Sequence, residues 1–359
     1  MKILLLGEFS GFYKYLKEGL EKNGAVVDWY ACGDGYKQIK GMDGDVEAHT
    51  GIKVIDKIFY PFFLVLRLRK YDVVQLVHPL IFSSKINFFL MRLLKYKCKV
   101  FCLSAVGTDY VFYRYGKSEN RKYTYFALDG CDDYDTFYSQ RRFIRNDISV
   151  INMCDAIIPG SYEYVLAYEN YSKVLPQIPL PINTDDIEYQ ENIFSDKVIF
   201  FHGLNRENFK GTKYIRAAME KLKEKYPDEV EIIIDGRLPL EQYMAVMRKA
   251  NVIIDQCKAY APGINALIAM AQGKVVLSGA ENLLLPGVEK KDYPIWHIGP
   301  DVEQIFLALE YILLNKEKIP TWGKRSREFV EEHYKYTKVA KMYEETWGNL
   351  ISHNNQKGK

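Results

Sequence analysis

The stretch NVIIDQCKAYAPGINALIAMAQGKVVLSG, residues 251–279, decides the fold that we predict for this chain. Its first apolar run ends in Asp255 and a short loop, Pro262 and Gly263 open a longer apolar segment, and Gly273 separates that segment from a third apolar run. Continuous apolar runs are typical of strands buried on both faces of a parallel sheet, and a Gly just past a helix favours its end. We therefore expect a strand, a helix and a strand at 252–254, 264–271 and 275–277.

The start of this helix, at Gly263, is the first candidate binding site. The N–H groups in the first turn of a helix have no partner within the helix, and the helix dipole places positive charge at that end. An anion such as a phosphate group is therefore the expected ligand.

The same alternation of apolar runs and amphipathic segments recurs along most of the chain. We expect strands at 3–6, 25–30, 73–77, 99–103, 156–159, 198–201 and 230–234, and helices at 12–22, 55–69, 85–95, 214–224, 240–248, 302–315 and 325–347. Such alternation predicts α/β architecture with doubly wound parallel sheets, in which ligands bind beyond the carboxyl ends of the strands.

Two domains are expected from the length of 359 residues. The segment 173–181 carries three prolines and cannot be helical, and the polar stretch 183–196 after it reads as an interdomain linker. Two α/β domains joined in this way predict a ligand-binding cleft between facing strand ends.

The composition is that of a globular protein, with 48% hydrophobic and 26% charged residues. A net charge of +3 gives no nucleic-acid footprint, although it suits an anionic small substrate. The six cysteines show neither CxxC pairs nor Cys/His metal spacing, so we expect free thiols and no bound metal. No signal peptide or bilayer-spanning run is evident, so the expected location is the cytoplasm.

The stretch between Ser104 and Asn152 breaks the alternation and is dense in Tyr, Phe, Arg and Asp. Aromatic and charged insertions after a strand often form binding surfaces, because aromatic faces stack on sugar rings. A packed helical insertion with solvated charges fits the same composition equally well, and the sequence leaves both interpretations open.

The loop HGLNRENFKGT, residues 202–212, is the best candidate site after the opening stretch. Gly203, Arg206, Lys210 and Gly211 would gather two cations and free backbone donors before a helix, as an anion site requires. A solvated turn with two surface cations remains the alternative. The spacing is not that of a nucleotide-hydrolysing P-loop.

Weaker candidates lie in the first half of the chain. The loop from Gly7 to Gly11, with Ser10, is a lesser version of the same arrangement, although a turn needs Gly for geometry alone. Asp109, in a GTD turn, could orient a sugar hydroxyl or act as a base, and a purely turn-forming Asp is commoner. His78 and His202 follow strands, without any partner carboxylate evident in the sequence.

The helices expected at 55–69 and 85–95 are apolar and end in cations. Helices of this kind can lie in an anionic membrane interface, but helices that flank a parallel sheet look alike in sequence. We favour the core-facing interpretation and leave peripheral membrane contact through the N-terminal domain open.

These features together resemble the GT-B glycosyltransferases, and most specifically the glycosyltransferase family 4 group that builds bacterial surface polysaccharides. The resemblance covers nearly the whole chain. It rests on the segments GTD at 107–109, CDAIIPGS at 154–161, FHGLNRENFKGT at 201–212, NVIIDQ at 251–256 and PGINALIAMAQGKVV at 262–276.

The resemblance implies a GT-B fold, with two Rossmann-like domains facing a central cleft. The implied acceptor-side domain is 1–182 plus a returning C-terminal helix at 325–350, and the implied donor-binding domain is 183–324. The donor would be a nucleotide diphosphate sugar of UDP or GDP type, with no tightly bound cofactor and no metal. Contacts to the donor are implied for Arg206 and Lys210 on the diphosphate, for Gly263, Ile264 and Asn265 at the helix start, and for Gly7 and Ser10 in the facing loop.

The family's two signature glutamates are absent from this chain. Tyr260 and Ile268 stand in their places, and an Ile cannot accept the hydrogen bonds that the second glutamate receives from the donor ribose. Losing such a bond weakens binding by about 1.5 to 3 kcal/mol.

We therefore expect a retaining glycosyltransferase that transfers a sugar from a nucleotide diphosphate sugar to a glycan or lipid-linked acceptor in surface polysaccharide synthesis. It would work in the cytoplasm, at the inner face of the membrane if it binds one. The alternative is a catalytically inactive GT-B-like protein that binds a glycan or partners another transferase. A third option is another sugar-nucleotide enzyme of this fold, such as an epimerase.

Overall fold

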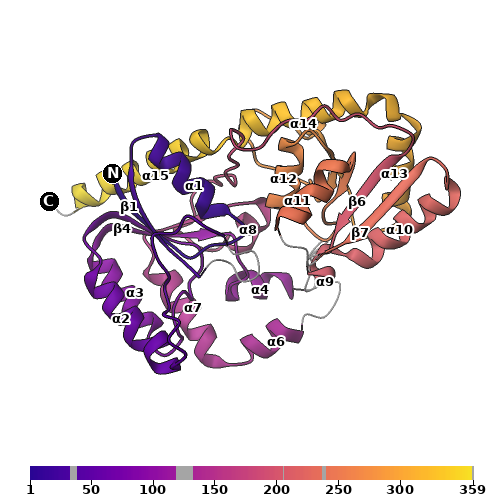
Figure 1. Cartoon of the computed structure of the whole chain (residues 1–359). Coiled ribbons are helices and arrows are strands. Elements are labelled where there is room, and N and C mark those ends of the chain that lie inside the picture. The colour runs from indigo at the N-terminus through magenta and orange to yellow at the C-terminus, as the bar shows by residue number, and fades with distance from the viewer. Residues whose placement is uncertain (33–38, 119–131, 205, 237–239, 358–359) are drawn as a thin grey trace. The chain divides into compact units, whose positions relative to one another are not determined.

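The computed structural model describes residues 1–32, 39–118, 132–204, 206–236 and 240–357. The chain divides into two compact units, each with its own parallel sheet (Figure 1). Unit 1 contains Met1–Tyr115, Asp132–Pro181 and Tyr336–Lys359, and unit 2 is built mainly from Ile182–Lys335.

The sheet of unit 1 has five parallel strands in the order β2-β1-β3-β4-β5. One face packs against the helices within residues 60–67, 87–96 and 141–153, and buries residues such as Leu4, Val74 and Phe101. The strands are β1 (Lys2–Leu6), β2 (Val26–Tyr30), β3 (Tyr71–Leu76), β4 (Cys98–Ala105) and β5 (Ala156–Pro159). The helices are α1 (Phe12–Lys22), a π-helix (Ile55–Phe59), α2 (Tyr60–Arg67), α3 (Asn87–Tyr96), α4 (Tyr110–Gly116), α6 (Asp132–Tyr138), α7 (Arg141–Met153), α8 (Tyr162–Ala167) and α15 (Tyr336–Lys357).

The sheet of unit 2 also has five parallel strands, in the order β10-β9-β8-β6-β7. The strands are β6 (Val198–Gly203), β7 (Val230–Asp235), β8 (Val252–Ile254), β9 (Val275–Ser278) and β10 (Ile295–His297). The helices are α9 (Glu207–Lys210), α10 (Thr212–Lys225), α11 (Leu240–Lys249), α12 (Ile264–Ala271), α13 (Val302–Leu314) and α14 (Ile319–His333), with 3-10 turns at Lys290–Asp292 and Lys316–Lys318. Within the described part of the chain, no helix is both long and apolar enough to cross a bilayer.

The two sheets share one topology, because in each the first strand lies between the second and the third. In unit 1 β1 pairs with β2 and β3, and in unit 2 β6 pairs with β7 and β8. The chain leaves the first strand on one side and the third strand on the other, which makes a topological switch point at their carboxyl ends. Open α/β sheets bind their ligands at such a point, so the loops after β1, β3, β6 and β8 are the places to look for a site.

The predicted α/β class with two parallel sheets is confirmed, and several element bounds agree with the sequence analysis. The helices at 12–22 and 264–271 and the strands at 156–159 and 252–254 have the expected ends. Gly273 follows α12 with a φ of 85°, the left-handed conformation that its place after the helix predicts.

Other expectations differ from the structure. The single helix expected at 325–347 is two helices, α14 and α15, because the carbonyl of Tyr334 accepts the N–H of Ile182 and Lys335 forms a bridge with the same residue. This tertiary pairing takes backbone groups that a continuous helix would need. The strand β10 was not predicted, and the helix expected at 55–69 begins with a π-helix.

After the end of β4 at Ala105, most of the described part of the stretch 104–152 is helical, in α4, α6 and α7. Its part at 119–131 lies outside the described residues. The packed helical interpretation therefore holds for the described part, where Tyr110 and Tyr113 pack on Tyr138.

Helix α15 packs along α1 on the face of sheet 1 opposite α2 and α3 (Figure 1). Gly19 permits this contact, because a Cβ there would lie 2.4 Å from the carbonyl oxygen of Tyr336. The buried indole N–H of Trp347 donates to the side chain of Gln75 over 2.9 Å, and Gln75 donates in turn to Ser104 over 2.9 Å. These bonds attach the end of the chain to the centre of the sheet.

We predict that Gly19→Ala lowers the stability of unit 1 although Ala is the better helix former. An added methyl group would force α1 away from α15, with an expected loss of about 1–3 kcal/mol in the free energy of unfolding. The matched control is Gly348→Ala within α15, where an added Cβ meets nothing within 4 Å. It should be neutral or stabilising by up to about 1 kcal/mol. Denaturant midpoints of the two variants measure the difference, and equal midpoints would contradict the proposed close contact.

Candidate functional site

The switch point of unit 2 brings together most of the residues predicted to bind an anion. Gly203 ends β6, Arg206 and Lys210 flank the short helix α9, and Gly263 caps α12 after the β8 loop. Two bonds join the β6 and β8 loops directly: the N–H of Cys257 donates to the carbonyl of Lys210, and the ammonium of Lys258 donates to the carbonyl of Asn208.

Arg206 is an exposed cation of this loop and has an unusual backbone conformation. Its φ and ψ are 54° and 66°, in the left-handed region, and its guanidinium lies over the ring of Phe209 at 5.4 Å. Ser10, in the corresponding loop of unit 1, has a φ of 58°. Left-handed residues other than glycine occur preferentially at functional sites, so this backbone supports a functional role for both loops.

Lys210 lies deeper and already has an anionic partner. Its ammonium donates to the Asp255 carboxylate over 2.9 Å, and the two side chains are only 10% and 3% exposed. Burial alone would lower the pKa of Lys210, but the attraction of Asp255 holds this pKa above its ordinary value. Lys210 is therefore a charged member of a neutral buried pair, whereas the guanidinium of Arg206 faces solvent.

The second oxygen of Asp255 occupies the start of α12. It accepts the N–H of Gly263 over 3.2 Å and lies 3.4 Å from the hydroxyl of Ser278. The N–H groups of Ile264 and Asn265 belong to the first turn, for which the helix itself supplies no acceptor. These two groups are the donors that a ligand anion would meet.

Tyr260 and Ile268 are both buried within unit 2. The carbonyl of Tyr260 accepts the N–H of Glu281 over 2.9 Å, which ties the β8 loop to the loop after β9. Ile268 belongs to a helix whose residues are almost all buried. A carboxylate at position 268 would be buried and would need a hydrogen-bond donor or a counter-charge, so an apolar side chain suits this environment.

Gly203 and Gly211 are required by close packing. A Cβ on Gly203 would lie 2.5 Å from the Tyr243 hydroxyl, and one on Gly211 would lie 2.4 Å from the Cys257 sulfur. Gly211 also has a φ of 75° between α9 and α10. Both glycines shape the loop, and the structure assigns Gly203 no contact of its own to a ligand.

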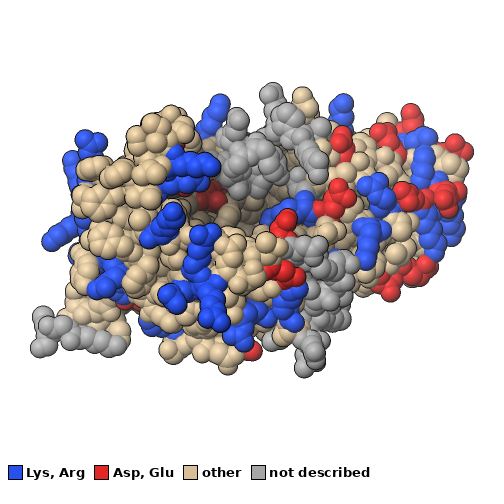
Figure 2. Space-filling model, turned by 90° about the horizontal axis from the view of Figure 1, so that it is seen from below, with Lys and Arg blue, Asp and Glu red and all other residues tan. Residues whose placement is uncertain are grey.

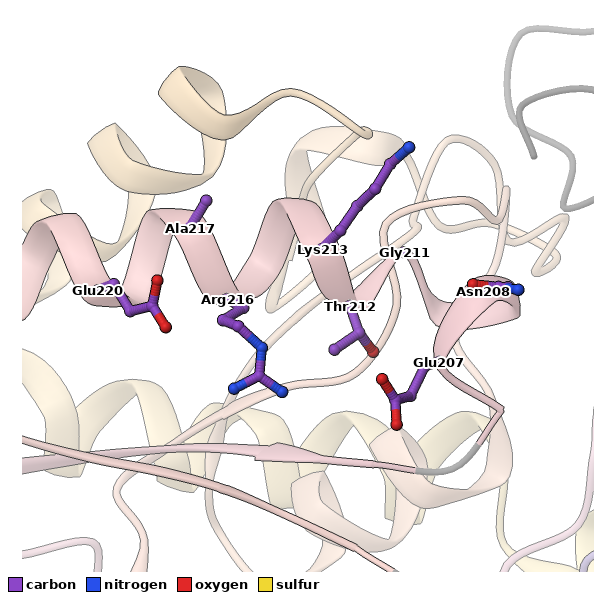
Figure 3. A pocket seen from close by; sticks show the side chains of 8 residues that line it. All are labelled: Glu207, Asn208, Gly211, Thr212, Lys213, Arg216, Ala217 and Glu220. Carbon is purple, nitrogen blue, oxygen red and sulfur yellow. The ribbon is translucent and has the colours of Figure 1, made fainter.

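A pocket of about 270 Å³ lies beside the start of α10. Figure 3 shows Glu207, Thr212 and Arg216 directed to one side of the α9–α10 segment, and Lys213 directed to the other. The Thr212 hydroxyl is already bound to His202 over 2.9 Å. Because Glu207 and Glu220 offset the positive charge of Arg216, this pocket is poorly suited to a diphosphate.

The switch point of unit 1 differs from that of unit 2 in charge. The buried carboxylate of Glu8 accepts the N–H groups of Gly11 and Lys14 over 2.8 and 3.0 Å, so the start of α1 already holds an anion. The N–H of Gly7 donates to the carbonyl of Tyr30. Gly7 has a φ of 88°, and a Cβ on it would lie 2.4 Å from Val77. The backbone N–H of Gly7 is therefore not a free donor for phosphate, and its glycine is explained by geometry.

His78 and Asp109 lie close together at the carboxyl ends of β3 and β4 but serve the fold. His78 accepts the N–H of Leu80 at Nδ1 over 3.0 Å, and its Nε2 lies 3.2 Å from the carbonyl of Thr108. In that arrangement Nδ1 is the acceptor and Nε2–H is the donor. Both ring nitrogens are engaged within the fold, and a catalytic role for His78 stays a prediction.

Asp109 is a buried helix cap. One of its oxygens accepts the N–H of Phe112 over 2.9 Å at the start of α4, and the other accepts the hydroxyl of Tyr168. Burial raises the pKa of Asp109 to about 6, with a further increase from nearby Asp147. The turn-forming interpretation accounts for this residue, whose exposed fraction is 2%.

His202 lies within β6 and does not follow the strand as predicted, because β6 extends to Gly203, and its side chain is buried. Its Nδ1 lies 2.7 Å from the carbonyl of Ile254 and its Nε2 lies 2.9 Å from the Thr212 hydroxyl. Burial and the neighbouring Lys210 lower its pKa to about 4, so the ring is neutral at physiological pH. Among the residues that the structure describes, no group of three or more His, Cys, Asp or Glu side chains is placed to hold a metal ion.

Comparisons with known proteins find no match to a family pattern and none to a curated protein at the sequence level. Solved structures do match over almost the whole chain. Sucrose-phosphate synthase from Thermosynechococcus elongatus is 16% identical with a TM-score of 0.65, covering 98% of this chain and 100% of that one. HepE from Anabaena, in complex with UDP and glucose, is 11% identical with a TM-score of 0.60, covering 97% and 100%.

A third match is UDP-GlcNAc 2-epimerase from Neisseria meningitidis bound to UDP-GlcNAc, at 12% identity and a TM-score of 0.55, covering 96% of this chain and 99% of that one. Two parallel five-stranded sheets of one shared topology complete the likeness. The chain has the GT-B fold. At these identities the likeness establishes the fold alone.

Sequence reasoning missed the residues that organise the two switch points of this GT-B chain. Asp255 was seen only as the end of a strand, and Glu8 only as part of a loop. Each carboxylate accepts a backbone N–H at the start of a helix, at Gly263 and Gly11. An acidic residue directly after a strand and shortly before a helix is the signal that could have found them.

We predict that Asp255→Asn destabilises unit 2 by about 3 kcal/mol or more, because it leaves the ammonium of Lys210 buried without a counter-charge. Asn keeps an oxygen for the N–H of Gly263. The double variant Lys210→Met with Asp255→Asn should recover much of the loss, since neither charge then remains. Denaturation midpoints of the wild type, both single variants and the double variant test this. Additive losses in the double variant would show that the two residues do not depend on each other.

We predict that Asp109→Asn stabilises the protein above pH 6 and has little effect near pH 4. The raised pKa means that the folded state favours the protonated carboxyl, so stability present at low pH is lost as the pH rises from 3.8 through about 6. Asn stays neutral throughout, and the expected gain at pH 8 is on the order of 1–3 kcal/mol. Unfolding curves at pH 4 and pH 8 measure it. A loss of stability at pH 8 would mean that the ionised carboxylate stabilises the fold.

Proposed function

We propose that this protein is a glycosyltransferase that moves a sugar from a nucleotide diphosphate sugar to a glycan or lipid-linked acceptor. The observation that carries the proposal is the unit 2 switch point. The loop after β6 carries exposed Arg206, and it is hydrogen-bonded to the loop after β8, which leads into α12. The neighbour HepE, which has the same fold, was solved with UDP and glucose, and the epimerase was solved with UDP-GlcNAc. Both ligands carry the diphosphate chemistry that this switch point suits.

The catalytic contribution of this site would be electrostatic. The guanidinium of Arg206 and the N–H groups of Ile264 and Asn265 would stabilise the negative charge that develops on the departing diphosphate. The pair of Lys210 with Asp255 has no net charge, so Lys210 would contact phosphate directly only if that pair opened. The site needs neither a tightly bound cofactor nor a metal in this scheme.

The finer assignments belong to the same proposal. We assign donor binding to unit 2 and acceptor binding to unit 1, whose switch point presents the carboxylate of Glu8 in place of free donors. A retaining reaction of the family 4 type, a UDP or GDP donor, and a role in surface polysaccharide synthesis in the cytoplasm stay predictions from the sequence. The described cysteines are free thiols, as a reducing compartment allows.

Two other functions compete with this one. A catalytically inactive partner protein would explain why Tyr260 and Ile268 stand in the places of the signature glutamates. An epimerase would explain the match to a UDP-GlcNAc 2-epimerase. Both the transferase and the epimerase bind a nucleotide sugar, so nucleotide binding separates these enzymes from an inactive protein, and product analysis separates them from each other.

We predict that UDP or GDP raises the melting temperature of the protein and that Arg206→Ala weakens this binding about ten- to a hundredfold. Loss of one charge-assisted contact to the diphosphate is the physical reason. The matched control is Arg248→Ala. That exposed arginine lies near the end of α11, just before β8 begins, and so at the opposite edge of the sheet.

Thermal shift and calorimetric titration with UDP, GDP, ADP and their sugars provide the measurement. Arg248→Ala should bind like the wild type. No stabilisation by any nucleotide would remove the enzyme proposal, and equal affinities for the Arg206→Ala and Arg248→Ala variants would place the diphosphate elsewhere.

A further inference from the structure

One surface of unit 1 exposes large apolar side chains that its core does not use. They lie on the π-helix, on α2 and at the start of α3, and we call them the aromatic row: Phe59, Phe63, Leu66, Phe88 and Phe89. Each is between 41% and 57% exposed. Isolated exposed apolar residues are normal, but a contiguous group on adjacent helices marks an interaction site.

The members of the aromatic row lie side by side. Phe59, Phe63 and Leu66 are spaced four and three residues apart in one continuous helical segment, so they share one side of it. The ring of Phe62 stacks on that of Phe89 at 6.3 Å and 15°, which joins α2 to α3. The row therefore forms one surface across two helices.

Packing against the sheet does not explain this surface. The core-facing sides of the same helices are already buried, through Pro61 and Val65 on α2 and through Leu90, Met91 and Leu94 on α3. Each helix thus has an apolar side in the core and a second apolar side toward solvent. The core-facing interpretation of these helices is correct for one side and leaves the aromatic row unexplained.

The charges around the aromatic row are almost all positive. Residues 53–97 contain nine Lys and Arg and only two Asp and Glu. Asp72 pairs with Lys99, and the buried carboxylate of Asp56 accepts the N–H groups of Thr50 and Gly51. The exposed cations within residues 53–97 and on the adjoining α7 are Lys53, Lys57, Arg67, Arg69, Lys70, Lys85, Arg92, Arg141, Arg142 and Arg145.

Figure 2 shows this character directly. On the part of the view that belongs to unit 1, Lys and Arg stand among uncharged residues and Asp and Glu are scarce, whereas unit 2 mixes both signs of charge. Aromatic side chains surrounded by cations are suited to the surface of an anionic bilayer. The rings can insert at the boundary between headgroups and acyl chains, and the cations can bind lipid phosphates.

We propose that the aromatic row and its surrounding cations dock unit 1 on an anionic lipid bilayer as a peripheral contact. Charge complementarity selects this occupant over a second copy of the chain. In a two-fold dimer through this surface, the cations around the aromatic row of one copy would face those of the other. Repulsion between these like charges opposes such an interface.

This inference deepens the proposed function and rests on it only where it concerns the acceptor. A lipid-linked acceptor would lie at the same membrane surface as unit 1. Docking itself requires no nucleotide, so vesicle binding and UDP binding can succeed or fail separately.

The test is cosedimentation of the full-length protein with vesicles of phosphatidylcholine alone and of phosphatidylcholine mixed with phosphatidylglycerol. We expect binding to the anionic vesicles only, and a decline with added salt. The variant Phe59→Ser, Phe63→Ser and Leu66→Ser should lower the partition at least about tenfold. Because these side chains are exposed, the melting temperature and any nucleotide binding should stay at wild-type values.

The matched control is Leu307→Ser, Tyr311→Ser and Leu314→Ser, on an exposed apolar row of α13 with the same spacing of four and three residues. This control should bind anionic vesicles like the wild type. A second variant, Lys85→Glu with Arg92→Glu, should weaken binding about tenfold or more. The proposal would be overturned if the two serine variants partitioned equally, or if the wild type bound neutral and anionic vesicles equally. It would also be overturned if the wild type self-associated without binding vesicles and the Phe59→Ser, Phe63→Ser and Leu66→Ser variant lost that self-association.

Discussion

The carboxylate of Asp255 is the group on which the arrangement of the unit 2 switch point depends. One oxygen holds Lys210 from the β6 side, and the other accepts the N–H of Gly263 at the start of α12. Because the group is nearly fully buried, each partner it lost would leave an uncompensated charge or donor. We infer that this pair serves less to add net stability than to hold the two loops in one arrangement, with Arg206 on the outside.

The two units show that one topology can carry opposite electrostatics. Both sheets place their first strand between the second and the third, and both leave a helix start at the switch point. In unit 1 Glu8 supplies the anion for that helix from within the chain, while in unit 2 the loop carries an exposed arginine. The fold alone therefore does not determine the charge at a switch point, and the residues of the loops do.

Hydrophobic periodicity was sufficient to predict the α/β class and most of the strands, because strands buried on both faces must be apolar along their whole length. Glycine positions were also readable, as Gly273 shows. Residue type alone could not separate a ligand-binding side chain from one that binds its own fold. Lys210, Asp109 and His202 have the right chemistry for a site, yet each makes at least one bond to a partner far away in the sequence. The sequence left membrane contact of the helices at 55–69 and 85–95 open, but it could not identify the aromatic row, since both apolar sides of α2 look alike in the sequence.

The sequence by itself determined the number and the kind of sheets and the loops in which an anion site could lie. Local patterns set these features, because burial, helix starts and tight turns each demand particular residues at short spacing. Only the tertiary structure decided which charges remain for a ligand, that the last predicted helix breaks at Tyr334, and which side of α2 faces solvent. These outcomes depend on contacts between residues distant in the chain, and no local pattern records such contacts.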